Sequence, residues 1–163
     1  VPGSVLWLPA FNDLCCGNLR REAALRGVDA NRLVFAPIVS FDAHSKRLPA
    51  ADLFLDTYPY SAGATANQTL GCGVPLLTMA GDCYVSRMAG SMLHALGVDE
   101  LIAGSMANYE ATALALASTP ERRHACHARL RDTQRRARLF SPAAAARALE
   151  TAYEKLIGDG NAR

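Results

Sequence analysis

ADLFLDTYPYSAGATANQTLGCGVPLLTMAGD, residues 51–82, shows the clearest alternation of structural patterns in the chain. The apolar residues 53–55 predict a short buried strand, which runs into a turn rich in tyrosine and proline. The small residues 61–68 then open a predicted helix that ends at a glycine, and residues 74–79 predict the next strand. A strand, a helix and a second buried strand in this order are typical of a parallel βαβ unit.

The same alternation continues upstream of this unit. Two apolar runs predict strands at 5–8 and 33–36, and the amphipathic residues 17–26 between them predict a helix. Gly27 directly follows that helix, as expected of a glycine that ends a helix in the left-handed conformation. The upstream half therefore predicts a second βαβ unit.

Downstream of residue 82 the pattern is mainly helical. Thr119-Pro120 and Ser141-Pro142 each fit an N-cap residue followed by proline at the first helical position. Helices are predicted at 84–96, 106–117, 120–138 and 142–157, with an edge segment at 97–102. We therefore predict an α/β fold, a Rossmann-like doubly wound parallel sheet, with a helical C-terminal extension at 118–163.

Length and composition fit one globular domain over residues 1–163. The chain has a mass of 17.4 kDa, half of its residues are apolar and one fifth are charged, which suffices for a core and excludes a disordered chain. No apolar run approaches the roughly 18 residues that cross a bilayer. The opening Val1-Pro2-Gly3-Ser4 has neither an initiator methionine nor a secretion signal, so we expect a cut from a longer protein. The five cysteines include no CxxC pair, which favours reduced thiols and a cytoplasmic location.

Charge is unevenly distributed along the chain. Residues 1–119 hold 7 basic and 10 acidic groups, a net of −3, whereas residues 120–163 hold 10 basic and 5 acidic groups, a net of +5. Arginine supplies most of this excess, at 122, 123, 129, 131, 135, 136 and 138. Such a cluster can attract nucleic acid, but no aromatic side chains interleave with the arginines as stacking platforms. A solvated helix face is the favoured interpretation, and nucleic-acid binding is the alternative.

The small-residue segment 61–68 is the first candidate for a binding site. Gly63, Ala64 and Thr65 have little side chain, so the backbone N–H groups at the start of the predicted helix can approach an anion, and the helix dipole favours a phosphate. Thr65 adds a hydroxyl donor, and Gln68, one turn later, can hydrogen-bond a ribose hydroxyl. The segment matches neither a GxxxxGK[ST] loop nor a GxGxxG fingerprint. Close packing of small residues is the alternative interpretation.

His44 and Arg47 form the second candidate. They lie three residues apart on a predicted short helix capped by Ser40 or Asp42, so one helix face carries both side chains. An imidazole can stack on a base and a guanidinium can contact a base edge or a phosphate, although an exposed pair of this kind is often only surface. The remaining histidines have no carboxylate or cysteine at metal-ligand spacing, so no metal site is predicted.

A set of short motifs resembles a known family. VPGSVLWL at 1–8, NRLVFAP at 31–37, HSKR at 44–47, the whole stretch 51–82 and SR at 86–87 occur in the order found in the C-terminal lobe of O-GlcNAc transferases and their SPINDLY-like and bacterial TPR-linked relatives. ELI at 100–102, Tyr109 and the terminal SP…LE.AY at 141–153 extend the resemblance over nearly the whole chain.

The resemblance implies an inverting GT-B glycosyltransferase, in which two Rossmann-like lobes face a cleft and the C-terminal lobe holds a UDP-sugar, typically UDP-GlcNAc, without an essential metal. His44 and Arg47 fall on the uracil-contacting residues of the family, and Val39 falls where a backbone group contacts the base. The His-Thr-Thr phosphate loop of the family falls on residues 63–65, where only Thr65 matches. The ribose-binding Asp falls on Gln68.

These departures weaken the resemblance at the phosphate loop. The missing imidazole and hydroxyl remove two donors, each worth on the order of 1–3 kcal/mol when charge-assisted. In this family the acceptor-side groups, a diphosphate-neutralising Lys and the TPR repeats lie upstream, so no catalytic residue is expected in this chain, which alone is expected to be inactive. The expected function is donor binding for transfer of GlcNAc to Ser/Thr of proteins recruited by upstream regions. A decayed lobe that acts as a scaffold is the alternative.

Overall fold

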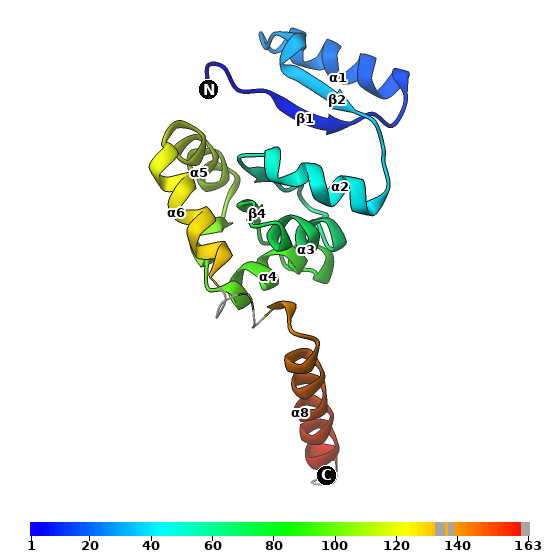
Figure 1. Ribbon diagram of the computed structural model, residues 1–163, viewed down its shortest axis with the longest axis vertical. Coiled ribbons are helices and arrows are strands. Elements are labelled where there is room, and N and C mark those ends of the chain that lie inside the picture. The colour runs from blue at the N-terminus through cyan, green and yellow to red at the C-terminus, as the bar shows by residue number, and fades with distance from the viewer. Residues whose placement is uncertain (133–135, 137–138, 161–163) are drawn as a thin grey trace. The chain divides into compact units, whose positions relative to one another are not determined.

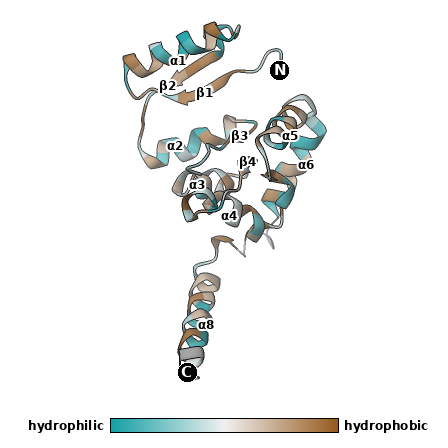
Figure 2. Ribbon diagram, turned by 180° about the vertical axis from the view of Figure 1, so that it is seen from behind, coloured by the Kyte–Doolittle hydropathy of each residue, from teal (hydrophilic) through white to brown (hydrophobic). Residues whose placement is uncertain are grey.

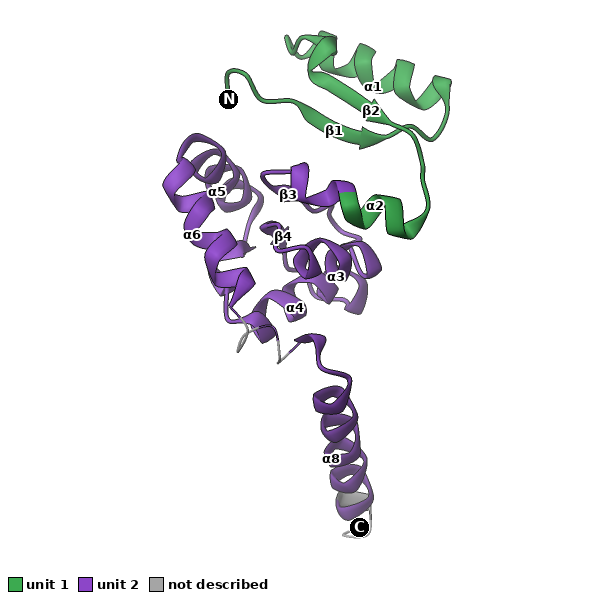
Figure 3. Cartoon of the chain, viewed as in Figure 1, with its two compact units in different colours: residues 1–46 green, residues 47–163 purple. Residues whose placement is uncertain are grey.

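A computed structural model describes residues 1–132, 136 and 139–160 of the chain. The chain divides into two compact units, residues 1–46 and residues 47–163 (Figure 3). The division falls within helix α2 (Phe41–Arg47), and each unit is considered by itself.

The first unit is a parallel βαβ arrangement. Strand β1 (Leu6–Pro9) pairs with strand β2 (Leu33–Ala36) over four residues, from Leu6 opposite Leu33 to Pro9 opposite Ala36. Helix α1 (Asp13–Leu25) and a 3-10 turn, η1 (Ala30–Arg32), connect the two strands (Figure 1). The upstream βαβ unit predicted from the sequence is therefore present.

Helix α1 begins earlier than its amphipathic pattern predicts. The Asn12 side chain accepts a hydrogen bond from the backbone N–H of Cys15 at 2.8 Å, which satisfies a donor at the helix start. This cap moves the start from the predicted Gly17 to Asp13. At the other end Gly27 has φ 71°, the left-handed conformation that a helix-ending glycine adopts.

The second unit contains a three-stranded sheet and most of the helices. Its strands are short, and 3-10 turns join several of them to helices. In chain order the elements after α2 are η2 (Leu48–Ala50), β3 (Phe54–Leu55), α3 (Ala64–Gly71), β4 (Leu76–Met79), η3 (Tyr84–Ser86), α4 (Met88–Leu96), η4 (Asp99–Leu101), β5 (Ile102–Ala103), α5 (Met106–Ser118), α6 (Pro120–Arg131) and α8 (Pro142–Gly160).

The sheet of the second unit is parallel, with strand order β3-β4-β5. Helices α3 and α4 cover one face, and α5 and α6 lie on the other side (Figure 1). The connections from β3 to β4 and from β4 to β5 are both right-handed crossovers in the same direction across the sheet. Both connecting helices, α3 and α4, therefore lie on the same face. Parallel strands with helices on both faces confirm the predicted Rossmann-like α/β fold.

The core of the second unit lies between the sheet and its helices. All four residues of β4 are buried, as expected of a central parallel strand covered on both faces. The cluster around it is built mainly from leucines of α3, α4 and α6, namely Leu70, Leu93, Leu96 and Leu130. Helix α8 carries polar and apolar residues in turn along its length (Figure 2). Within the described residues, no helix combines the length and apolarity needed to cross a membrane.

The arginine-rich segment is less exposed to solvent than its composition indicates. Three of its arginines donate to carbonyls at the ends of other helices: Arg123 to Leu116 and Ala117 of α5, Arg129 to Gly97 after α4, and Arg136 to Gly71 of α3. Cations are stabilised there by the helix dipole. Helix α6 ends at Arg131, and the remainder of the predicted helix includes residues 133–135 and 137–138, which lie outside the described residues.

Candidate functional site

The loop between β3 and α3 is held by a buried carboxylate. Asp56 follows β3 directly and is 8% exposed. Its Oδ1 atom accepts hydrogen bonds from the backbone N–H of Thr57 at 2.9 Å and of Ala62 at 2.8 Å. Its Oδ2 atom accepts one from the Thr78 hydroxyl of β4 at 2.7 Å. One side chain therefore ties both ends of the loop to the central strand.

Ser61 anchors the same loop from the opposite side. Its backbone N–H and its hydroxyl both donate to the Val85 carbonyl at 2.8 Å, and the hydroxyl accepts from the Ala89 N–H at 3.4 Å. Ser61 is 1% exposed, so water does not compete for these bonds. The loop is thereby joined to η3 and to the first turn of α4.

Tyr109 of α5 adds a third anchor. Its phenolic hydroxyl donates to the Asp56 backbone carbonyl at 2.8 Å. Burial is the main cause that raises the pKa of Tyr109 to about 12, and the nearby Asp56 charge is the second cause. The phenol therefore keeps the proton that it donates, even above its usual pKa of 10. The loop between β3 and α3 is therefore bound to β4, α4 and α5.

A hollow opens where this loop enters α3. Its volume is about 520 Å³, within the range of about 300–1,000 Å³ typical of ligand pockets. The residues that line it are Phe54, Leu55, Asp56, Thr57, Tyr60, Ser61, Ala62, Gly63, Ala64, Thr65 and Met88. A second hollow of about 490 Å³ shares Gly63, Ala64 and Met88 with the first and adds Tyr84, Arg87, Ser91, Met92 and Leu139. The start of α3 thus borders both hollows.

The N-terminus of α3 has the geometry of an anion site. Gly63 is its N-cap residue, and within the described part of the chain no side chain caps this helix. The first hydrogen bond from inside the helix back to Gly63 comes from Asn67, at 3.0 Å, so the N–H groups before it are the unpaired donors of a helix start. These donors and the positive end of the dipole stabilise a phosphate placed there.

Five of the predicted site residues lie in the second unit. Gly63, Ala64 and Thr65 line the first hollow together, as the small-residue segment predicts. Gln68 lies one turn further along α3 and is half-buried. Arg47 ends α2. The structure therefore brings the three candidate phosphate-loop residues to one hollow.

Val39 and His44 lie in the first unit. Val39 is exposed in the connection between β2 and α2. His44 and Arg47 are on the same short helix, and the Ser40 hydroxyl accepts from the backbone N–H of Ala43 at its start. The sequence offered Ser40 or Asp42 as the cap of this helix, and the structure shows that Ser40 caps it. The base-contacting roles of Val39, His44 and Arg47 stay predictions.

Asp56 and Arg87 were not among the sequence candidates, and Ser61 belonged to the candidate segment 61–68 only as a small residue, with no role assigned to its side chain. Asp56 and Ser61 act through partners more than 20 residues away, which single-sequence periodicity does not show. Arg87 lies in the SR motif and brings a cation to the hollow beside Gly63 and Ala64. The signal in the sequence that points to Asp56 is an acidic residue directly after the apolar run 53–55. The predicted burial of this strand is wrong, because Leu55 is 43% exposed.

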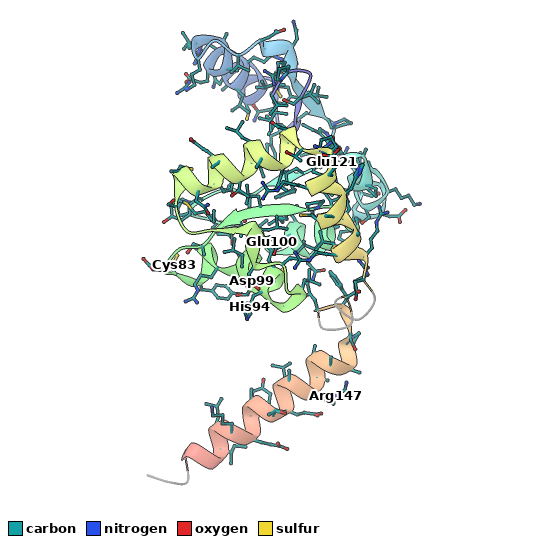
Figure 4. All side chains as sticks on the ribbon, turned by 90° about the vertical axis from the view of Figure 1, so that its left-hand side faces the viewer. Cys83, His94, Asp99, Glu100, Glu121 and Arg147 are labelled. Atoms are coloured by element: carbon teal, nitrogen blue, oxygen red, sulfur yellow. The ribbon has the colours of Figure 1, made fainter. Side chains whose placement is uncertain are left out.

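Other chemically active side chains lie outside the two hollows. Hydrogen bonding with Ser86 lowers the pKa of the exposed Cys83 thiol, and His94 and Asp99 form an exposed pair 2.6 Å apart (Figure 4). All five cysteines are free. Among the described residues, no group of three His, Cys, Asp or Glu side chains is arranged to hold a metal ion. The prediction that no metal is needed stays a prediction.

The fold and the site geometry are those of the Rossmann-like α/β proteins, whose ligands lie beyond the carboxyl ends of parallel strands. Comparison with known families shows which family within this class the chain matches. The sequence model of Glycosyl transferase family 41 matches residues 1–149. The chain belongs to this glycosyltransferase family, which confirms the resemblance predicted from the motifs.

Individual relatives agree with this assignment. A UDP-N-acetylglucosamine–peptide N-acetylglucosaminyltransferase of Caenorhabditis elegans is 36% identical over 116 residues, which are 71% of the chain and 10% of that protein. The probable enzyme of this name called SEC, from Arabidopsis thaliana, is 31% identical over 157 residues, 96% of the chain and 16% of that protein. A mutant O-GlcNAc transferase of Thermobaculum terrenum has a TM-score of 0.84 at 27% identity, over 93% of the chain and 30% of that structure.

Proposed function

We propose that the chain is the donor-binding lobe of a protein O-glycosyltransferase that uses a UDP-sugar, with UDP-GlcNAc the expected donor and Ser/Thr hydroxyls of proteins the acceptors. The observation that carries this proposal is the uncapped start of α3 at a hollow lined by Gly63, Ala64 and Thr65. The family membership and the names of the relatives support the choice of donor.

In the proposed reaction the bond between the sugar C1 and the diphosphate oxygen breaks as the acceptor oxygen bonds to C1. The diphosphate leaves with the bonding electron pair, and the hydroxyl proton passes to a base that we expect upstream of this lobe. The N–H groups at the start of α3, the Thr65 hydroxyl and the nearby Arg87 would stabilise the charge that develops on the diphosphate. Inversion at C1 follows from the family resemblance.

Titration of UDP into the chain and into the full-length protein tests this proposal. We expect saturable binding at millimolar UDP or below, and weaker binding by Thr65→Val, which removes one hydroxyl donor with little change of volume. Asn67→Ala is a matched control, since Asn67 is an exposed neighbour on α3 that does not line either hollow. Absence of binding by UDP and by every other nucleoside diphosphate contradicts the proposal.

A scaffold role without sugar transfer is the second candidate, because Gly63, Ala64 and Gln68 replace the His, Thr and Asp that the resemblance leads us to expect. Combining Gly63→His, Ala64→Thr and Gln68→Asp distinguishes the two. A Cβ at position 63 would stand 3.3 Å from the Met88 sulfur, the far part of a flexible side chain that can move aside. Sugar transfer gained only in the triple variant favours the scaffold, and an active wild type excludes it.

A further inference from the structure

Asp56 combines features that single it out among the described side chains at the site. It is a carboxylate at 8% exposure, and it accepts three hydrogen bonds, from Thr57, Ala62 and Thr78. Two of these donors belong to the backbone of the loop, and the third belongs to the central strand. A buried carboxylate is tolerated when such donors satisfy it, and its bonds are stronger than those between neutral groups.

The two oxygens of Asp56 perform different tasks. Oδ1 binds the N–H groups of residues 57 and 62 together, which closes the loop on itself. Oδ2 binds the Thr78 hydroxyl and so fixes the closed loop to β4. The chain leaves this arrangement at Ala62 and enters α3 at Ala64. The direction of the first N–H groups of α3 therefore depends on where Asp56 holds Ala62.

We propose that Asp56 is a positioning residue of the donor site, which sets the loop 57–63 so that the start of α3 presents its N–H groups to the diphosphate. This inference rests on the proposed function. Although Asp56 lines the first hollow, all three of its hydrogen bonds are to donors of the protein, so we assign it no direct bond to sugar or diphosphate. Its effect is on the diphosphate end of the donor, and the nucleoside end is independent of it.

The test compares two ligands in full-length protein carrying Asp56→Ala or Asp56→Asn. Asparagine keeps an acceptor at Oδ1 and can donate to the Thr78 hydroxyl, whereas alanine removes all three bonds. We expect Asp56→Ala to raise the Kd of UDP about tenfold, which corresponds to about 1.4 kcal/mol, and to leave the Kd of uridine unchanged within about twofold. Asp56→Asn is expected to remain within about threefold of wild type for both ligands. Asp82→Ala, at an exposed carboxylate, is the control.

Thr78→Val provides a milder variant in case Asp56→Ala does not fold. It removes only the bond to Oδ2, and we expect a smaller loss of UDP affinity with uridine again unaffected. Equal losses for UDP and uridine, or no loss for UDP, overturn the positioning role. An Asp56→Asn protein that binds UDP normally but has lost its turnover also overturns it, because that pattern assigns proton transfer to Asp56.

Backbone hydrogen exchange separates this inference from the proposed function. If the wild type binds no nucleoside diphosphate, the proposed function fails, and exchange at residues 57–65 still tests Asp56. Faster exchange there in Asp56→Ala, with α5 and α6 unchanged, supports the positioning role. Unchanged exchange in the loop overturns it.

Discussion

Arg87 shows how one side chain alters the chemistry of the site. It lines the second hollow with Gly63 and Ala64, whereas Thr65 lines only the first hollow. A guanidinium carries a fixed charge and several donors suited to a phosphate. In the proposed donor site, Arg87 would compensate for the donors that the resemblance leads us to expect at residues 63 and 64.

We predict that Arg87→Ala weakens UDP binding by about 3–10-fold and reduces its dependence on salt, because one charge no longer faces the diphosphate. Isothermal titration at two salt concentrations measures both effects. Arg122→Ala removes an exposed arginine of α6 and is expected to change neither. Equal behaviour of the two variants contradicts the assignment of Arg87.

Tyr109 predicts a dependence of stability on pH. Its pKa rises from 10 to about 12 on folding, so between these values the unfolded chain loses the proton while the folded chain keeps it. The phenol therefore stabilises the fold below pH 10, and this contribution is lost as pH rises toward 12. Tyr109→Phe should cost about 1 kcal/mol at neutral pH through the lost bond to Asp56.

Denaturant unfolding of wild type and Tyr109→Phe at about pH 8 and about pH 11 measures this contribution. We expect the difference in free energy of unfolding between wild type and Tyr109→Phe to be smaller at the higher pH. A difference that is constant or widens contradicts the assigned pKa.

At the scale of single residues, the sequence predicts those site residues whose role depends on neighbours along the chain. Gly63, Ala64 and Thr65 could be found because small residues before a helix expose its N–H groups. Asp56 and Ser61 could not, because their roles depend on Thr78, Val85 and Ala89, which only the fold brings near.

At the scale of elements, hydrogen bonds from arginine side chains to the carbonyls at helix ends join the helices of the second unit to one another. Arg123 donates to the carbonyls of Leu116 and Ala117 at 3.0 and 3.1 Å, and its side chain is 16% exposed. We predict that Arg123→Ala lowers the free energy of unfolding by about 1–3 kcal/mol, because two helix carbonyls lose a charged donor. Arg122→Ala, one residue earlier, should stay within about 0.5 kcal/mol of wild type in the same denaturant titration. Similar losses for the two variants contradict the capping role.

The elements were predicted best where an apolar run or a helical pattern ended at a clear stop signal. Strand β2 was predicted with the observed bounds, and Gly27 ends α1 as expected. The start of α1 was wrong because the Asn12 cap outweighs the apolar pattern, and strands such as β3 and β5 are two residues long because pairing partners limit them.

At the scale of the whole chain, the positive charge of residues 120–163 is a poor guide to function. Three of its arginines are engaged at helix ends, and residues 135 and 138 lie outside the described residues. We predict no mobility shift of DNA or RNA by the chain at low salt, where electrostatic binding is strongest. A steeply salt-dependent complex contradicts this prediction and revives the nucleic-acid alternative.

The hydrogen bonds between Asp56 and its loop also have a consequence for the evolution of the site. Its contacts with residues 57 and 62 are to the main chain, which every residue except proline supplies equally. Mutations can therefore replace side chains at 62–64 while the loop keeps its shape. Lineages of this family can therefore vary the side chains at the proposed diphosphate site without losing the loop, and a combinatorial library at these three positions measures how many such variants still fold and bind UDP.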